Sequence, residues 1–281
     1  MNTIYASPVC KLEELKDIFI ELTARNCNMR CRECYIEFPF NKNIKDFIKT
    51  DAVKTGLEQL KSQELRCIYL TGAEPMTHPD FNSILRLCIQ KSDVCICTNA
   101  SFINEKKARF LKNVELASTN NISFKLSFTH WDEIKNDSVR SRGAYRQNIF
   151  ALKCLDKYEF LNIINISNYY KESHNKLINE FQSKLSDIGI QNAVIQISEW
   201  KSSCQNSPLN DTNWELNGAT DCMTSRTLTS TGIFACPFLA NDYRGRMGSD
   251  FNNYSKTIRL ETEFCATCLR NKDKIFTVEL E

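Results

Sequence analysis

The sequence predicts an α/β protein, a partial (β/α)6 TIM-like barrel followed by a small cysteine-bearing C-terminal domain. Between residues 17 and 198, six apolar, strand-like segments alternate with amphipathic helical segments. This alternation is typical of a parallel sheet, and right-handed crossovers would curl such a sheet into a partial barrel. Beyond Trp200 the pattern changes to a polar connection and then to a segment with four cysteines. We therefore expect a barrel domain over residues 1–200, and a linker with a C-terminal domain over residues 201–281.

Charge and apolar patterning exclude several classes of protein. The 281 residues carry a net charge of +2, from 36 basic and 34 acidic side chains, which predicts no electrostatic grip on nucleic acid or an anionic membrane. No apolar run approaches the roughly 20 residues of a membrane span, and the N-terminus does not resemble a signal peptide. Fourteen cysteines with clustered spacings favour metal binding over disulfides. We expect a cytoplasmic protein with neither nucleic acid nor membrane as a partner.

The elements follow from the periodicity of apolar residues. The predicted barrel strands are 17–22, 67–71, 94–100, 122–128, 160–166 and 193–198. Apolar residues at helical spacing predict five helices between them, with the faces Val53, Leu57 and Leu60; Phe81, Ile84, Leu85 and Cys88; Phe110, Leu111, Val114 and Ala117; Tyr145, Ile149 and Leu152; and Ile178, Phe181, Leu185 and Ile188. Short strands are expected in the C-terminal domain at 232–234 and 275–278. Functional residues should lie where the barrel strands end.

Three cysteines follow the first predicted strand in the spacing C-x3-C-x2-C, namely Cys27, Cys31 and Cys34. Three thiolates are too few to saturate a [4Fe-4S] cluster, so one iron would keep an open position for a small molecule. A zinc site is the alternative, but zinc takes four ligands, and no histidine or fourth cysteine lies nearby in the sequence. The pattern favours an iron–sulfur cluster.

The cysteine spacing and its place after the first strand resemble the radical S-adenosylmethionine (SAM) superfamily. In that family the open iron chelates the amino and carboxylate groups of SAM, so the resemblance implies SAM as a cofactor. The segment Gly72, Ala73, Glu74 and Pro75 resembles the family's Gly-Gly-Glu-Pro motif, which meets the SAM amino group through backbone carbonyls and the glutamate. Ala73 departs from that motif, and a modest shift of the turn is expected because alanine disfavours positive φ.

Further residues match the family in order along the chain. Ser127 ends the fourth strand and Arg140 follows it, resembling the segment in which a serine and a later arginine contact the SAM ribose and carboxylate. An arginine fork suits a carboxylate, and Arg142 is a second candidate. Thr98 and Asn99 hold the place where related enzymes contact SAM or substrate.

One departure lies inside the cysteine loop. The family usually has an aromatic residue just before the third cysteine, near the adenine. Glu33 holds that place here, and the aromatic Tyr35 follows the cysteine instead. The resemblance therefore implies Tyr35 as the aromatic residue near SAM, with altered packing of the adenine.

A second cysteine set lies near the C-terminus, with Cys222 and Cys236 separated by a glycine turn and Cys265 and Cys268 forming a C-x2-C pair. It resembles the twitch domain, the shortened SPASM domain that carries one auxiliary [4Fe-4S] cluster. Four thiolates would saturate that cluster. A zinc knuckle with four cysteine ligands is the alternative, which spacing alone does not exclude.

The resemblance implies a radical oxidoreductase. An electron from the first cluster, supplied by a flavodoxin- or ferredoxin-type reductant, would cleave SAM to methionine and a 5′-deoxyadenosyl radical, which takes hydrogen from a C–H bond. The auxiliary cluster would then accept an electron, giving a two-electron oxidation. The chain most resembles the alcohol dehydrogenases of aminoglycoside biosynthesis. No leader-peptide-binding domain precedes the barrel, so a small polar substrate, sugar- or aminocyclitol-like, is expected.

Other functions stay open at this point. One is epimerisation of a sugar or peptide residue, with Cys204, in the loop after the sixth strand, as hydrogen donor. Another is crosslinking of a ribosomal peptide. A non-catalytic zinc module would leave the motifs around Glu74 and Arg140 unexplained. His130 is either a substrate contact or a surface histidine. The cysteines outside the two sets, apart from Cys204, are expected to be small core residues.

Overall fold

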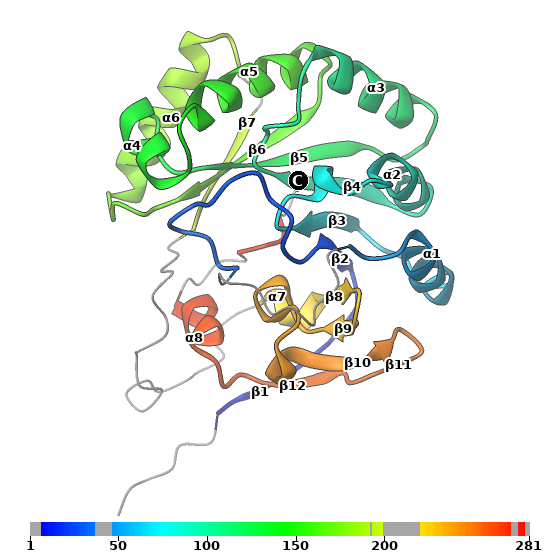
Figure 1. The fold of residues 1–281 in the computed structure, drawn as a ribbon. Coiled ribbons are helices and arrows are strands. Elements are labelled where there is room, and N and C mark those ends of the chain that lie inside the picture. The colour runs from blue at the N-terminus through cyan, green and yellow to red at the C-terminus, as the bar shows by residue number, and fades with distance from the viewer. Residues whose placement is uncertain (1–6, 37–46, 192, 199–219, 271–274, 279–281) are drawn as a thin grey trace, which may run out of the picture.

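The computed structural model describes residues 7–36, 47–191, 193–198, 220–270 and 275–278. Within them, parallel strands form a curved sheet with helices on its outer face (Figure 1). The strands are β2 (Asp17–Thr23), β3 (Cys67–Gly72), β4 (Asp93–Thr98), β5 (Ile122–Phe128), β6 (Leu161–Ser167) and β7 (Ala193–Ser198). The helices are α1 (Thr50–Gln59), α2 (Phe81–Ile89), α3 (Glu105–Leu116), α4 (Glu133–Val139), α5 (Ala144–Lys157) and α6 (His174–Asp187). The predicted α/β fold with a mostly parallel sheet is confirmed, and it is consistent with a partial barrel.

The central strands β3 and β4 are buried on both faces, which explains their nearly continuous apolar sequences, whereas the edge strand β7 is only half-buried. The main core lies between the sheet and the helices; α2, for example, buries the predicted face of Phe81, Ile84, Leu85 and Cys88. A separate cluster of Phe19, Tyr69, Cys95 and Ile163 fills the inside of the barrel. The outer core holds the strands in register, and the inner cluster closes the barrel below the strand ends.

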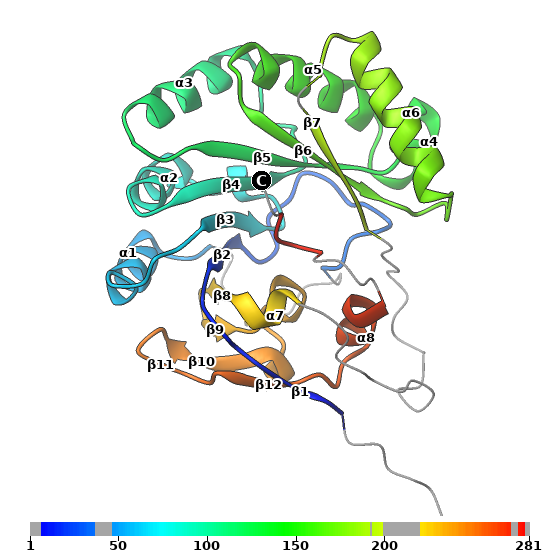
Figure 2. The ribbon, with the colours of Figure 1, turned by 180° about the vertical axis from the view of Figure 1, so that it is seen from behind.

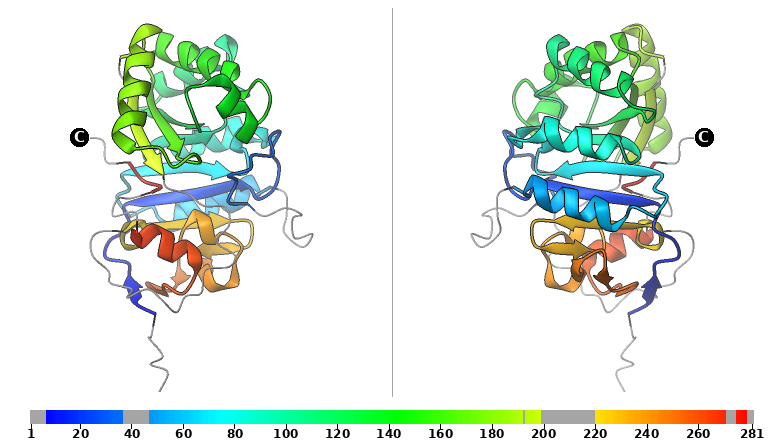
Figure 3. Two further views of the ribbon diagram at one scale, coloured as in Figure 1. Left: turned by 90° about the vertical axis from the view of Figure 1, so that its left-hand side faces the viewer. Right: turned by 90° about the vertical axis from the view of Figure 1, so that its right-hand side faces the viewer.

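The C-terminal unit continues the barrel sheet. β8 (Ser225–Thr229) pairs in parallel with β2, and β9 (Gly232–Phe234), β10 (Arg246–Asp250) and β11 (Asn253–Tyr254) follow in antiparallel order. The remaining helical elements here are α7 (Asp221–Thr224), α8 (Glu263–Arg270), η4 (Pro237–Leu239) and η5 (Tyr243–Gly245). This unit lies against the β2 edge of the barrel (Figure 3).

The N-terminal strand belongs with this C-terminal unit. β1 (Val9–Lys11) pairs antiparallel with β12 (Thr257–Arg259), beside β10 (Figure 2). Cys10 on β1 is buried among Ala235, Cys236 and Cys265. The predicted division at residue 200 assigns this strand to the barrel, whereas its pairing joins it to the C-terminal unit.

The predicted strand at 275–278 is wrong. The segment is irregular, because side chains rather than a neighbouring strand satisfy its backbone. Asp221 accepts hydrogen bonds from the amides of Ile275, Phe276 and Thr277, and Lys125 donates to the carbonyls of the first two. The segment enters the barrel next to Tyr69, whose hydroxyl accepts from the amide of residue 278. Among the described residues, no helix has the length and apolar character needed to cross a membrane.

Candidate active site

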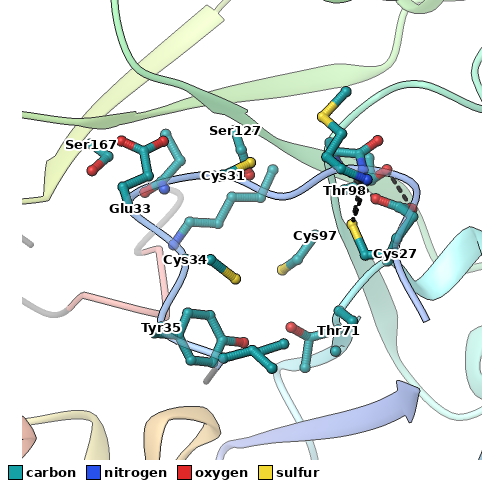
Figure 4. A pocket seen from close by; sticks show the side chains of 18 of the residues that line it. Cys27, Cys31, Glu33, Cys34, Tyr35, Thr71, Cys97, Thr98, Ser127 and Ser167 are labelled. Carbon is teal, nitrogen blue, oxygen red and sulfur yellow. Dashed lines mark hydrogen bonds between the residues drawn. The ribbon is translucent and has the colours of Figure 1, made fainter. Parts of the chain in front are cut away.

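One cavity at the C-terminal ends of the strands brings the predicted site residues together (Figure 4). All three loop cysteines line it. So do most of the other predicted residues: Tyr35, Gly72, Ala73, Glu74, Thr98, Asn99, Ser127 and Arg140. Pro75 starts the short helix η1 (Pro75–Thr77) and is buried behind the cavity wall. Residues from the ends of β3, β4 and β5, or from the segments that follow them, thus meet the cysteine loop at one place, as the barrel prediction requires.

The cysteine loop is held by its own backbone and by β4. Cys27 Sγ accepts hydrogen bonds from the amide of Met29 at 3.3 Å and from Asn99 Nδ2 at 3.6 Å. The amide of Cys34 donates to the carbonyl of Cys31 at 3.2 Å. Burial raises the pKa of Cys34 to about 11 and also raises those of Cys27 and Cys31. Metal binding would therefore have to displace thiol protons.

The cysteine sulfur atoms are not gathered as closely as the ligands of a single bound zinc ion. Zn–S bonds of about 2.3 Å place tetrahedral sulfur ligands roughly 3.8 Å apart. In the part of the chain that the structure describes, the only three potential ligand atoms within 4.8 Å of one another belong to His130, Glu172 and Glu180. No three sulfur atoms of either cysteine set lie within that distance of one another, and thiolates are the ligands that hold an iron–sulfur cluster.

Gly72 carries the backbone strain of the turn after β3. Its φ is +122°, and a Cβ there would lie 2.3 Å from the carbonyl oxygen of Thr23. Ala73 has no positive φ, and its amide donates to the same oxygen at 2.8 Å. The departure from Gly-Gly-Glu-Pro is thus accommodated, because the conformation that requires glycine falls on the first position.

Glu74 links the ends of β3 and β4. Its fully buried carboxylate accepts hydrogen bonds from the Thr98 hydroxyl at 2.8 Å, the Asn99 amide at 2.8 Å and the Met76 amide at 3.1 Å. Burial raises the pKa of Glu74 to about 7, although these donors oppose the shift. The side chain expected to contact the SAM amino group therefore also fixes the two loops around it.

Arg140 is paired with the residue that replaces the family's aromatic. Arg140 Nη1 lies 3.4 Å from Glu33 Oε1, which also accepts from the Thr129 hydroxyl at 2.6 Å, and both charged side chains are buried. The Ser167 side chain lies beside the Glu33 carboxylate (Figure 4), whereas Arg140 Nε is buried without a hydrogen-bond partner among the described residues. This free donor borders the cavity and fits a ligand that carries an acceptor. Arg142 is exposed and does not line the cavity.

Two cavity residues, Lys125 and Cys97, were not among the predicted site residues. Lys125 lies on the inner face of β5, and Cys97 points into the cavity from β4 (Figure 4). A signal for Lys125 was present: side chains alternate along a strand, so it shares the face of Ser127. Cys97 was expected in the core, and nothing in its sequence context distinguishes it from Cys95.

Two other candidate residues from the sequence are Cys204 and His130. Cys204 lies outside the described residues. His130 is neither a surface histidine nor a cavity residue: it is buried, with Nε2 3.1 Å from Glu172 Oε1 and 3.2 Å from Lys135 Nζ. Lys135 Nζ also donates to Glu172, so the carboxylate beside His130 already has a cationic partner.

The C-terminal cysteines come together in the second unit. Cys236 and Cys265 are buried in one cluster with Cys10, and Cys222 packs against them. The thiols of Cys222 and Cys236 are in hydrogen-bonding contact, and Cys268 lies within electrostatic reach of Cys222 and Cys265.

Aromatic rings connect this unit to the cavity. The Phe238 ring lies 5.2 Å from the Tyr35 ring and 4.3 Å from the Phe276 ring, and Phe276 also contacts Phe19 inside the barrel. Tyr35 is thus turned toward the C-terminal unit while it lines the cavity.

Comparison with known proteins agrees with this fold. No curated protein sequence matches the chain. Similar solved structures include Streptococcus suis SuiB, at 14% identity and a TM-score of 0.59, covering 86% of this chain and 64% of SuiB. The structure of anSMEcpe with AdoMet and the Kp18Cys peptide is 14% identical, with a TM-score of 0.61, covering 91% of this chain and 82% of anSMEcpe. The family described as Radical SAM superfamily matches residues 22–179, more than half of the sequence, and the chain belongs to that superfamily.

Proposed function

We propose that this chain is a radical SAM oxidoreductase that removes hydrogen from a C–H bond of a small polar substrate. When bound, a [4Fe-4S] cluster and SAM supply reductive cleavage of SAM and, from it, the hydrogen-abstracting species. The observation that carries the proposal is the convergence of Cys27, Cys31 and Cys34 with Glu74 and Arg140 on one cavity.

The chain's own residues have distinct roles in this proposal. The three cysteines hold the cluster, and Asn99 orients Cys27 through its hydrogen bond to the sulfur. Arg140 would hold the SAM carboxylate with its remaining donors, Glu33 fixing the guanidinium from the other side. Ser127, at the end of β5, would contact the ribose.

The substrate class is inferred from the polar side chains at the ends of β6 and β7. Asn165, Ser167 and Ser198 line the cavity there, and Ser198 Oγ donates to Asn165 Oδ1 at 3.3 Å. The Ser167 side chain lies beside the Glu33 carboxylate in the same cavity (Figure 4). Hydroxyl and amide groups of this kind suit a ligand with several hydroxyls, such as a sugar or aminocyclitol.

The C-terminal cysteines are proposed to hold an auxiliary [4Fe-4S] cluster. Cys222, Cys236, Cys265 and Cys268 would provide four thiolates, which saturate such a cluster and suit electron transfer rather than substrate ligation. Its role would be to accept the electron that the substrate radical gives up, with loss of a proton, as it becomes the oxidised product, while a flavodoxin- or ferredoxin-type protein reduces the first cluster.

A second candidate is radical modification of a peptide, including epimerisation. The anSMEcpe structure that covers 91% of this chain holds a peptide, and Cys97 presents a thiol in the cavity. A thiol near the substrate could return a hydrogen atom, the role first expected of Cys204. Oxidation does not need this step.

Arg140→Lys tests the assigned SAM site. A lysine cannot reproduce the planar fork, and losing one charge-assisted hydrogen bond costs about 1.5–3 kcal/mol, roughly 10- to 100-fold in SAM affinity. Equilibrium binding of SAM to the reconstituted protein measures the effect, with Arg142→Lys as the exposed control. Equal SAM affinities of the wild type and Arg140→Lys would show that Arg140 does not hold the SAM carboxylate.

Isotope incorporation separates oxidation from epimerisation. Anaerobic turnover in heavy water, with panels of aminocyclitols and of peptides, should yield a product two hydrogens lighter than its substrate. Cys97→Ala and Cys204→Ala should both remain active. Thiols exchange their protons with water, so a hydrogen atom returned by a cysteine would appear in the product as deuterium. A deuterated product of unchanged oxidation level, absent from the reaction of either cysteine variant, would contradict oxidation.

A further inference from the structure

A buried arginine lies beside the C-terminal cysteines without a carboxylate partner. Arg226 on β8 is 0% exposed. Its Nη1 donates to the carbonyls of Cys222 and Ser225, both at 2.7 Å, and its Nη2 donates to the carbonyl of Lys256 at 3.2 Å. Among the described residues, its Nε has no hydrogen-bond partner and no carboxylate forms an ion pair with its guanidinium.

Such a cation is costly to bury unless an anion lies close by. Arginine is almost never fully buried without a charged partner, and carbonyl dipoles compensate only part of the lost hydration. The ionisable groups that act most strongly on this guanidinium are Cys222, then Tyr254, Cys10 and Cys236. Three of the four are cysteines of the C-terminal cluster or its immediate neighbour on β1.

A metal–thiolate centre would supply the missing anion. Four thiolates around a [4Fe-4S]2+ core carry a net charge of −2, and one-electron reduction makes that charge −3. A fixed positive charge nearby therefore stabilises the loaded centre, and it stabilises the reduced state more than the oxidised state.

We propose that Arg226 is the built-in counter-cation of an anionic metal–thiolate centre formed by Cys222, Cys236, Cys265 and Cys268. It is a positioning residue: it fixes the carbonyl of Cys222 and raises the reduction potential of the centre. This inference rests on the proposed auxiliary cluster and identifies Arg226 as the residue that balances the negative charge of that cluster.

The rival role is purely structural, and the two roles differ in the metal-free protein. If Arg226 only anchors the backbone, its loss lowers thermal stability equally with and without metal. If it balances the charge of the centre, its removal harms the loaded protein but spares or stabilises the metal-free protein, where the buried cation has no anion.

The experiment uses the full chain with Cys27, Cys31 and Cys34 changed to Ala, so that any remaining iron belongs to the second site. Into this background we would introduce Arg226→Met, Arg226→Lys and the control Arg259→Met, which removes an exposed arginine from β12. Iron and sulfide content, Tm with and without the cluster, and a redox titration followed by electron paramagnetic resonance are measured.

Arg226→Met should at least halve the Tm gain on reconstitution while leaving the metal-free Tm unchanged or higher. At a fixed potential its ratio of reduced to oxidised centre should fall at least tenfold, a shift of about 59 mV for one electron. Arg226→Lys should fall between wild type and Arg226→Met, and Arg259→Met should match the background.

Equal losses of Tm in both forms, including failure to fold in both, or an unchanged potential would overturn the inference about Arg226 alone. Absence of iron and sulfide from the triple-cysteine background would overturn the auxiliary cluster, and the inference with it. The iron analysis of the background therefore separates the two failures.

Discussion

Gly72 shows how a single backbone position supports the candidate site. Its φ of +122° lies in a region that only glycine adopts readily, and the carbonyl of Thr23 leaves no room for a Cβ. The turn that it forms brings Glu74 under the ends of β3 and β4.

Replacing Gly72 by Ala should therefore destabilise the protein by about 1–3 kcal/mol, the typical cost of a strained backbone position. Ala73→Gly, which restores the glycine of the family motif next door, should cost no more than about 1 kcal/mol. Denaturant unfolding of the metal-free proteins measures both. Similar stabilities for the two variants would show that the turn relaxes to accept a side chain.

Glu21 makes the stability of the fold depend on pH. It is buried at the junction with the C-terminal unit, where its carboxylate accepts hydrogen bonds from Asn241 Nδ2 at 3.1 and 2.7 Å. Burial raises the pKa of Glu21 from 4.5 to about 7. Between these values the folded state holds more protons than the unfolded state, so this group's contribution to stability falls as the pH rises from 4.5 to 7.

Glu21→Gln should remove that dependence. At pH 8 the variant should be more stable than wild type by about 1–3 kcal/mol, and the difference should shrink or reverse near pH 5. Denaturation midpoints of the metal-free proteins at both pH values test this, with the exposed Glu58→Gln as control. A difference that does not change with pH would mean that Glu21 is ionised throughout.

At the scale of elements, side chains rather than strand pairing hold the segment 275–278. The Asp221 carboxylate accepts the amides of residues 275–277 and the Thr277 hydroxyl, while Lys125 binds two carbonyls. An anion on the N–H groups and a cation on the C=O groups clamp the backbone between them. Phe276 is thereby held as a wall of the cavity.

Asp221→Asn should loosen this segment selectively. An amide offers one acceptor oxygen in place of two and turns a donor toward the backbone N–H groups, so we expect a local loss of about 2–4 kcal/mol. Hydrogen exchange of residues 275–277 should then be roughly thirtyfold faster or more, with β5 unchanged. Asp242→Asn, which touches only η5 and Arg244, is the control. Unchanged protection would assign the clamp to Lys125 alone.

The sequence predicted the elements well where local periodicity decides structure. The barrel strands and the buried face of α2 follow from spacing that burial on one or both sides imposes. The segment 275–278 could not be recognised, because its apolar pattern is that of a strand while its partners, Asp221 and Lys125, are distant in sequence. The pairing of β1 with β12 is equally non-local.

The candidate site was predictable where its residues form contiguous motifs. Cysteine spacing and the Gly72 turn carry their own geometry. The contact of Glu33 with Arg140 joins residues 107 positions apart, and the inward turn of Cys97 depends on the register of β4. Only the folded structure shows that Glu33, which replaces the aromatic residue of the cysteine motif, contacts Arg140 of the later motif.

At the scale of the whole molecule, one sheet joins the barrel to the C-terminal cysteines. The pairing of β8 with β2 and the rings of Tyr35, Phe238 and Phe276 connect the two cysteine sets through packed structure. This continuity suits a protein in which both sites take part in one reaction. Any such reaction would begin with the chemistry of the barrel cavity, where SAM is proposed to bind.

The most direct test of that chemistry is the formation of 5′-deoxyadenosine from SAM by the anaerobically reconstituted protein under chemical reduction. Wild type should produce it and should bind about eight irons, from two four-iron clusters. The variant with Cys27, Cys31 and Cys34 replaced by Ala should keep about half of that iron and form no 5′-deoxyadenosine. Undiminished 5′-deoxyadenosine formation by that variant would contradict the assignment of the radical SAM site to these three cysteines.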